Sequence, residues 1–258
     1  MLFDDKLPSD LIFSQNPGCD CQGTCIDPLK CACLLRSSGL NYLPDSRELQ
    51  HCFSDILNRP IYECNSNCSC TASCSNRLVQ NNVDDFSLLK RVDAFGKGLG
   101  VCAARNIEAG EFVCIYKGVY INPCDSAKVS FTHSSESGHV YVLQIREFAG
   151  DLERGKMIFE TVVDGACDGY GDFLPISSLI NHSCDPNLTV IPVRVDSVLP
   201  LLAFFAKRFI PMGEEVAYDY GERSSGNSSG KRCLCGAETC RGFLPNHDSL
   251  DLNCLSIN

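Results

Sequence analysis

The chain has 258 residues, 44% of them hydrophobic, a length typical of one mid-sized folded unit with appendages. Its 22 basic and 32 acidic residues give a formal charge of −10, which argues against a protein that grips nucleic acid by its phosphates and favours a basic partner. The longest apolar run, Val198–Ala206, is about half as long as a membrane span, which excludes a transmembrane protein. We also expect no secretory signal and therefore no wholesale disulfide formation.

Cysteines are concentrated near the N-terminus. Ten of the 19 lie in the 56 residues Cys19–Cys74, and nine of these ten follow the spacings C-x-C-x3-C-x5-C-x-C and C-x3-C-x-C-x3-C. Thiols this close together pack around a soft cation more readily than they cross-link, so the pattern favours zinc over the alternative, a disulfide-stapled segment. Three zinc ions offer twelve tetrahedral positions, which nine thiolates fill if three of them bridge two metals. The expected ligands are Cys19, Cys21, Cys25, Cys31, Cys33, Cys64, Cys68, Cys70 and Cys74. Cys52 is then surplus.

Between Asp85 and Gly221 the chain consists mainly of short apolar or alternating runs separated by turn residues. Their length and β-branched content favour strands, whereas the helical windows Ser126–Val129 and Ile176–Asn181 are both short. The sequence therefore predicts a mostly-β domain. The expected strands are Gly100–Arg105, Glu111–Lys117, His139–Arg146, Met157–Val163, Leu188–Val195 and Leu201–Lys207.

Two motifs in this region could indicate other functions. The glycine-rich run Gly96–Gly100 is similar to a dinucleotide-binding loop, but a strand-like run follows it in place of a long helix, which leaves a glycine-rich hairpin near a ligand or a plain tight turn. His182, Ser183 and Cys184 include two potential nucleophiles. Sequence neighbours rarely face one another in catalytic geometry, however, and no Gly-x-Ser-x-Gly elbow is present, so hydrolase chemistry is disfavoured.

A smaller group of cysteines lies near the C-terminus. Cys233, Cys235 and Cys240 follow a serine- and glycine-rich stretch, residues 222–232, that is typical of a flexible linker. Three thiolates are one short of a closed tetrahedral zinc site, so another part of the chain must supply a ligand. Cys184 is the candidate, and its alternative role is that of a small buried apolar side chain.

The chain resembles the SET-domain protein-lysine methyltransferases from roughly Pro17 to Leu244. The matching motifs are the nine-cysteine array, Gly96–Val101, Asn181–Asn187, Asp219-Tyr220 and the final C-x-C-x4-C, in that order. The resemblance implies a SET-domain fold of small β-sheets, in which the segment around 181–184 threads under another loop as a pseudoknot. It divides the chain into a pre-SET three-zinc cluster (17–82), a SET catalytic domain (85–221), the linker (222–232) and a post-SET zinc site (233–248).

The same resemblance implies a site for S-adenosyl-L-methionine on one face of the domain and a narrow channel for the substrate lysine on the other. Tyr220 matches the family's catalytic tyrosine, whose hydroxyl orients the amine and the methyl group. Tyr218 matches a position that is Phe or Tyr across the family, and a hydroxyl there favours mono- or dimethylation over trimethylation. The implied cofactor contacts are Lys97, Gly98 and Leu99 by their backbone, Tyr141, Asn181, His182, Tyr220, and Phe243 over the adenine.

The implied substrate is a histone H3 tail or nucleosome, with no sequence-specific nucleic acid, no membrane partner, and a nuclear, chromosomal location. Nine-cysteine pre-SET proteins commonly act on lysine 9, whereas the members most similar in Asn76–Gln80 and Ile191–Ser197 act on lysine 36, which is weakly preferred. Ser178 and Leu179 stand where the family usually has Arg-Phe. The alternatives are a weak or inactive zinc-stabilised chromatin-binding module and a methyltransferase for non-histone proteins.

Overall fold

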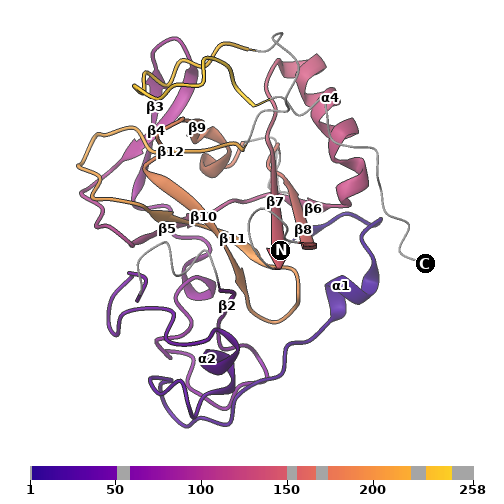
Figure 1. Cartoon of the computed structure of the whole chain (residues 1–258), viewed down its shortest axis with the longest axis vertical. Helices are drawn as coiled ribbons and strands as arrows, with labels where there is room; N and C mark the ends of the chain where they lie inside the picture. Colours follow the sequence, from indigo (N-terminus) through magenta and orange to yellow (C-terminus); the bar gives the residue numbers. More distant parts are fainter. Residues whose placement is uncertain (1, 51–58, 150–155, 167–173, 222–230, 246–258) are drawn as a thin grey trace.

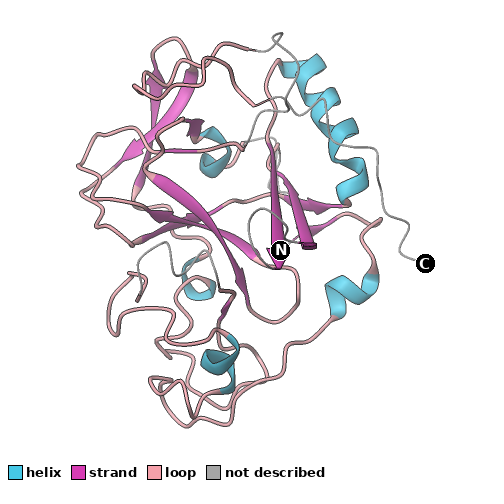
Figure 2. Ribbon diagram, viewed as in Figure 1, coloured by secondary structure: helices cyan, strands magenta, loops and turns pink. Residues whose placement is uncertain are grey.

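The computed structural model describes residues 2–50, 59–149, 156–166, 174–221 and 231–245, which form a mostly-β protein (Figures 1 and 2). The cysteine-rich coil occupies one end of the long axis, and residues 231–245 lie at the other end beside β3 and β4 (Figure 1). Cys52, residues 222–230 of the expected linker and residues 246–248 of the expected post-SET segment fall outside the described residues. No described helix has the length and apolar content to cross a bilayer.

Two four-stranded sheets make up the centre of the protein. One has the order β1 (Leu2–Phe3), β6 (Val119–Ile121), β8 (Lys156–Asp164) and β7 (Val142–Ala149). The other has the order β2 (Ile61–Tyr62), β10 (Leu188–Arg194), β11 (Leu201–Ala206) and β5 (Phe112–Ile115). Two smaller sheets pair β3 (Leu89–Ala94) with β4 (Gly98–Ala103) and β9 (Asn181–His182) with β12 (Ala217–Tyr218).

Strand β11 supplies side chains to two separate hydrophobic cores. Every residue of the strand is buried, because it lies between β10 and β5 with both faces covered. Successive side chains point to opposite faces, so Phe204 packs among Tyr116 and Tyr218 while Phe205 packs against Phe112 on the other side. The face of β11 that carries Phe204 is therefore the one that leads to the candidate active site.

The six expected strands are confirmed as β4, β5, β7, β8, β10 and β11, with ends that differ by up to three residues. Strand β3 was not expected, because three of its six residues are exposed polar side chains. Strands β1, β2, β9 and β12 contain two residues each, too few for any periodic pattern to show.

In the described ranges the helices are α1 (Ser9–Phe13), α2 (Ala32–Arg36) and α4 (Ser126–Ser137), with short 3₁₀ turns at η1 (Gln80–Asn82), η2 (Pro123–Asp125) and η3 (Ile176–Leu179). The expectation of a helix over Ser126–Val129 was too short: α4 continues to Gly138, whose positive φ of 71° ends it. Its serine-rich sequence has weak helical propensity, and packing beside β7 compensates for it. The expected helix at 176–181 is one 3₁₀ turn, and the chain is extended from Ile180.

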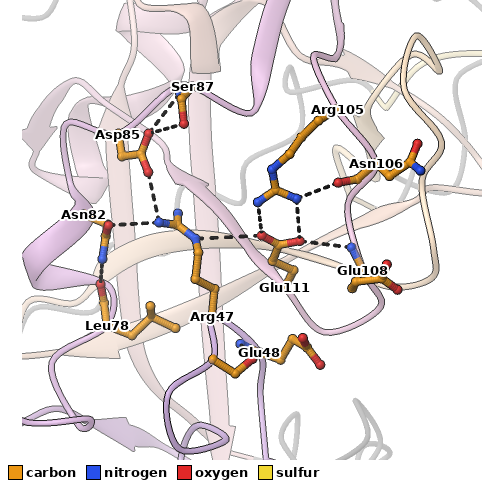
Figure 3. A network of polar contacts seen from close by, with 11 residues as sticks. Arg47, Glu48, Leu78, Asn82, Asp85, Ser87, Arg105, Asn106, Glu108 and Glu111 are labelled. Atoms are coloured by element: carbon orange, nitrogen blue, oxygen red, sulfur yellow. Dashed lines mark hydrogen bonds and ion pairs between the residues drawn. The ribbon is translucent and has the colours of Figure 1, made fainter.

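A buried carboxylate joins the N-terminal coil to the central sheets (Figure 3). Glu111 is 5% exposed and accepts two hydrogen bonds from Arg105, the shorter at 2.5 Å, while Nε of Arg47 lies 3.9 Å from the same carboxylate. Arg47 also donates to Asn82 and Asp85, each at 2.9 Å. Because Arg47 belongs to the coil and Glu111 precedes β5, this network sets the coil's orientation against the domain.

Candidate active site and metal centres

The candidate active site forms where two short strands meet. Strands β9 and β12 pair in parallel, with Tyr218 beside His182, and the backbone N–H of Ser183 donates to the carbonyl of Tyr218 at 3.1 Å. The chain between these strands passes through β10 and β11. The buried amide of Asn187 fixes the crossing, because its oxygen accepts from the Ala217 N–H at 2.8 Å. Residues 30 or more positions apart are thereby brought into contact.

Tyr218, Tyr220 and His182 form an aromatic cluster at this crossing. The Tyr220 ring lies 4.7 Å from that of Tyr218 and 5.3 Å from that of His182, centroid to centroid. The Tyr220 hydroxyl donates to the carbonyl of Ile180 at 2.8 Å. Burial raises the pKa of the Tyr218 and Tyr220 hydroxyls, so both phenols stay neutral near pH 7. They can orient a ligand through hydrogen bonds and do not act as bases.

Tyr116 belongs to this cluster, although nothing in the sequence singled it out. Its side chain is 4% exposed, its ring packs on Phe204, and Phe204 in turn packs on Tyr218. The Tyr116 hydroxyl donates to the backbone carbonyl of Tyr141 at 2.8 Å, which ties the predicted cofactor residue Tyr141 to the tyrosine cluster. The one available signal was an aromatic residue near the end of an expected strand, which is common in any buried strand.

The β3–β4 hairpin lies against Asn181. The Asn181 amide donates to the carbonyl of Leu99 at 3.2 Å and to Glu215 at 3.0 Å, and the Lys97 ammonium pairs with the same Glu215 carboxylate. Gly100 permits this approach, because a Cβ there would lie 2.8 Å from the Asn181 amide nitrogen. The Lys97 ammonium is thus held by Glu215, while Gly98 and Leu99 beside it are exposed. Glu215 was not singled out from the sequence.

Phe243 and Tyr141, two further residues of the predicted cofactor site, lie in other parts of the fold. Phe243 is half-buried and forms a β-bridge with Arg232, in the segment that also carries the C-terminal cysteines. Tyr141 is half-buried just before β7, and the His139 ring stacks on it with centroids 6.1 Å apart.

The N-terminal cysteines gather into one buried cluster in which three groups of four sulfur atoms each lie within 4.8 Å of one another. Cys64 belongs to all three groups, and its sulfur is 3.6 Å from that of Cys25, which is 3.7 Å from that of Cys19. Cys33 joins through Cys68, sulfur to sulfur at 3.5 Å, and Cys21 lies at the edge, where its thiol donates to the carbonyl of Lys30. The groups are Cys19/Cys25/Cys31/Cys64, Cys19/Cys64/Cys68/Cys70 and Cys25/Cys64/Cys70/Cys74.

The donor set fits a soft cation. Burial raises the pKa of the Cys19 and Cys25 thiols, so a positive ion is needed to keep thiolates at these positions. Donors also surround the cluster: the backbone N–H of Asn65 donates to Cys68 at 3.1 Å, and the guanidinium of Arg77 donates to Cys70 at 3.6 Å. All-sulfur tetrahedral sites of this kind suit zinc.

The C-terminal cysteines lie beside Cys184. The sulfurs of Cys184, Cys233, Cys235 and Cys240 lie within 4.8 Å of one another. The backbone N–H of Arg241 donates to the Cys184 sulfur at 3.3 Å, and Nε2 of His182 lies at the same distance from it. One four-thiol group therefore ties the C-terminal segment to the end of β9.

The chain matches two family models, the SET domain over residues 98–221 and the Pre-SET motif over residues 3–77. It is 34% identical to the probable histone-lysine N-methyltransferase set-23 of Caenorhabditis briggsae, covering 88% of this chain and 87% of that protein. It is 35% identical to the histone-lysine N-methyltransferase SETMAR of Bos taurus, covering 95% and 79%.

Solved structures agree with these relatives. The methyltransferase domain of human SETMAR superposes with a TM-score of 0.72 at 31% identity, over 90% of this chain and 82% of that one. KRYPTONITE in complex with mCHH DNA, an H3(1-15) peptide and SAH superposes with a TM-score of 0.70 at 27% identity, over 94% and 46%. The expected mostly-β fold is confirmed.

Proposed function

The chain belongs to the SET-domain family of S-adenosylmethionine-dependent histone-lysine N-methyltransferases, and from that premise we propose that it methylates histone H3, with lysine 36 preferred over lysine 9. The product is a mono- or dimethylated lysine, and the protein acts on chromatin in the nucleus. The observation that carries the proposal is the cluster of Tyr220, Tyr218 and His182 beside the β3–β4 hairpin.

Methyl transfer requires alignment more than covalent help from the protein. S-adenosyl-L-methionine supplies an electrophilic methyl group. We propose that this cofactor is held by the backbone of Lys97–Leu99 and by Asn181, His182, Tyr141 and Phe243. A lysine amine must lose its proton before it attacks, which costs roughly 4 to 5 kcal/mol at pH 7 from a reference pKa near 10.4. We propose that the neutral hydroxyl of Tyr220, which donates to the carbonyl of Ile180, orients that amine.

The methylation state follows from the Tyr218 hydroxyl. Tyr218 is 6% exposed and has no hydrogen-bond partner for this hydroxyl among the described residues, although it lies beside Tyr220. A polar group in such a place can hold a water molecule or crowd the amine, which disfavours a third methyl group. The preference for lysine 36 rests on the sequence resemblance in Asn76–Gln80 and Ile191–Ser197.

We also propose that the two thiol clusters bind zinc, about three ions in the N-terminal cluster and one at the C-terminal group. The nine N-terminal cysteines would use Cys19, Cys25 and Cys64 as bridges, because these three sulfurs lie in contact at the centre of the cluster. In the C-terminal group, Cys184 would supply the ligand that the other three cysteines lack.

A second candidate, an inactive chromatin-binding module, rests on Ser178. This side chain is 8% exposed and donates to the carbonyl of Gly165 at 2.7 Å, at a position where the family usually has arginine. The site therefore lacks a cation at residue 178. A module that binds histones without turnover would keep the fold and both thiol clusters.

The decisive experiment is methyl transfer from labelled S-adenosylmethionine to recombinant nucleosomes and free histones. We expect label on histone H3, and mass spectrometry to place it on lysine 36 with one or two methyl groups. Tyr220→Phe should abolish the transfer, whereas Tyr120→Phe should not, although it removes a hydroxyl bonded to a backbone carbonyl at the same 2.8 Å. Zinc-loaded, folded protein that binds histones but transfers no label would support the second candidate.

A further inference from the structure

The Arg241 side chain donates hydrogen bonds to Asp219 and Gly221, the residues on either side of Tyr220 in the turn after β12. Arg241 follows the last cysteine of the C-terminal group, and its side chain reaches back to the residues after β12. One terminal nitrogen of its guanidinium donates to Oδ1 of Asp219 at 2.5 Å, and the other donates to the carbonyl of Gly221 at 3.1 Å. Tyr220 lies between these two contacts.

The turn is closed around the same carboxylate. Oδ1 of Asp219 also accepts from the backbone N–H of Gly221 at 3.0 Å. Gly221 has a positive φ of 117°, a conformation that favours glycine, so the turn has little freedom for substitution. Arg241 therefore binds a turn that is already closed by its own hydrogen bond. Without the Arg241 side chain, Asp219 would keep only its hydrogen bond to the backbone of Gly221.

The backbone of Arg241 contacts the candidate metal centre. Its N–H donates to the sulfur of Cys184 at 3.3 Å. A single residue thus contacts a proposed zinc ligand by its main chain and the turn of the proposed catalytic tyrosine by its side chain. Phe243, the proposed cover for the adenine, follows two residues later.

The pair of Arg241 and Asp219 is the only ion pair that joins residues 231–245 to the remainder of the described chain. Among its other contacts, the segment is held by the Cys184 thiol group and by the Lys231 ammonium at the carbonyl of Gly138, the C-terminal cap of α4. The side chains of Arg241 and Asp219 are 34% and 41% exposed. A pair this accessible adds little to global stability, so its effect is local.

We propose that Arg241 is a positioning residue that clasps residues 231–245 onto the Asp219–Gly221 turn and so controls how tightly the cofactor site closes. This inference rests on the proposed methyltransferase function. Releasing the clasp loosens Phe243 on one side of the cofactor and the Tyr220 turn on the other. The affinity for the cofactor falls, and the transfer rate falls with it.

The geometry requires a guanidinium. Its planar fork reaches the Asp219 carboxylate and the Gly221 carbonyl from two nitrogens at once, whereas a lysine ammonium is a single point of charge. Arg241→Lys therefore keeps the charge and loses one of these two contacts, together with the approach of the same guanidinium to Nε2 of His182 at 3.4 Å. This variant separates the clasp from a general electrostatic effect.

The test uses the full-length, zinc-loaded chain and titration calorimetry with S-adenosylhomocysteine. Arg241→Ala should weaken binding on the order of tenfold, which corresponds to one lost charge-assisted hydrogen bond. Arg241→Lys should give a smaller loss. The double variant Arg241→Ala/Asp219→Asn should bind no worse than Arg241→Ala. The KM for S-adenosylmethionine should rise, with the KM for histone unchanged.

Arg208→Ala is the matched control. It removes another arginine–carboxylate pair of the same domain, to Glu214 at 2.6 Å with the arginine 55% exposed, and it should leave the affinity as in the wild type. Zinc content and thermal midpoint should stay at wild-type values in all variants. Unchanged affinity in Arg241→Ala overturns the clasp, and so does a loss of zinc that accompanies weaker binding. A wild-type chain that binds no S-adenosylhomocysteine overturns the proposed function itself.

Discussion

The backbone N–H of Tyr220 donates to Nδ1 of His182 at 3.2 Å, and this bond sets the tautomer of the histidine. Burial lowers the pKa of His182, so the ring is neutral near pH 7, and with Nδ1 as acceptor its proton lies on Nε2. Nε2 lies 3.3 Å from the sulfur of Cys184. The imidazole therefore donates to a proposed zinc ligand from one side and positions the proposed catalytic tyrosine from the other.

Tyr218→Phe should raise the number of methyl groups transferred. The change removes a hydroxyl that has no protein partner among the described residues, so the packing against Phe204 and Tyr220 survives. Mass spectrometry of histone H3 after exhaustive reaction should show trimethyllysine in the variant and mono- or dimethyllysine in the wild type. An unchanged product distribution would contradict the role assigned to this hydroxyl.

Cys64→Ser should release zinc from the whole N-terminal cluster, because Cys64 belongs to all three four-thiol groups. Metal analysis of the wild type should give about four zinc ions per chain, and the variant should lose about three of them. Cys102→Ser is the control: this thiol is buried in β4 outside every thiol group, and its loss should leave the zinc content intact. A wild-type value near one ion would refute the shared cluster.

The transfer rate should rise with pH up to about pH 10. Burial raises the pKa of Tyr116, Tyr218 and Tyr220, so the phenols remain neutral over this range, while the substrate amine loses its proton as the pH increases. Initial rates at saturating S-adenosylmethionine, with circular dichroism as a control for folding, would measure this. A fall in rate below pH 9 in folded protein would mean that one of these tyrosines ionises.

Glu111→Gln should destabilise the junction between the N-terminal coil and the sheets. The carboxylate is buried and faces two guanidinium groups, so its neutralisation should lower the free energy of unfolding by about 2 kcal/mol. Urea denaturation would measure the change. Glu108→Gln, three residues away on an exposed side chain, should have little effect, and equal losses in both variants would argue against the network in Figure 3.

The long strands could be predicted from the sequence, whereas the active-site crossing could not. β10 and β11 show runs of apolar and β-branched residues that any mostly-β protein would have. β9 and β12 contain two residues each, and they pair only because the chain between them brings the two segments side by side. A strand of that length has no periodicity, and its pairing is decided by tertiary packing.

Cysteine spacing and the short motifs determined most of what the sequence alone could establish: two thiol clusters, the family, and the tyrosines of the candidate site. These signals can be read from the sequence because metal ligands and tight turns constrain residues that are close together along the chain. The roles of Tyr116, Glu215 and Arg241 could be identified only from the tertiary structure. Each acts through a partner 22 or more positions away, as Arg241 does with Asp219, and such contacts depend on how the sheets cross.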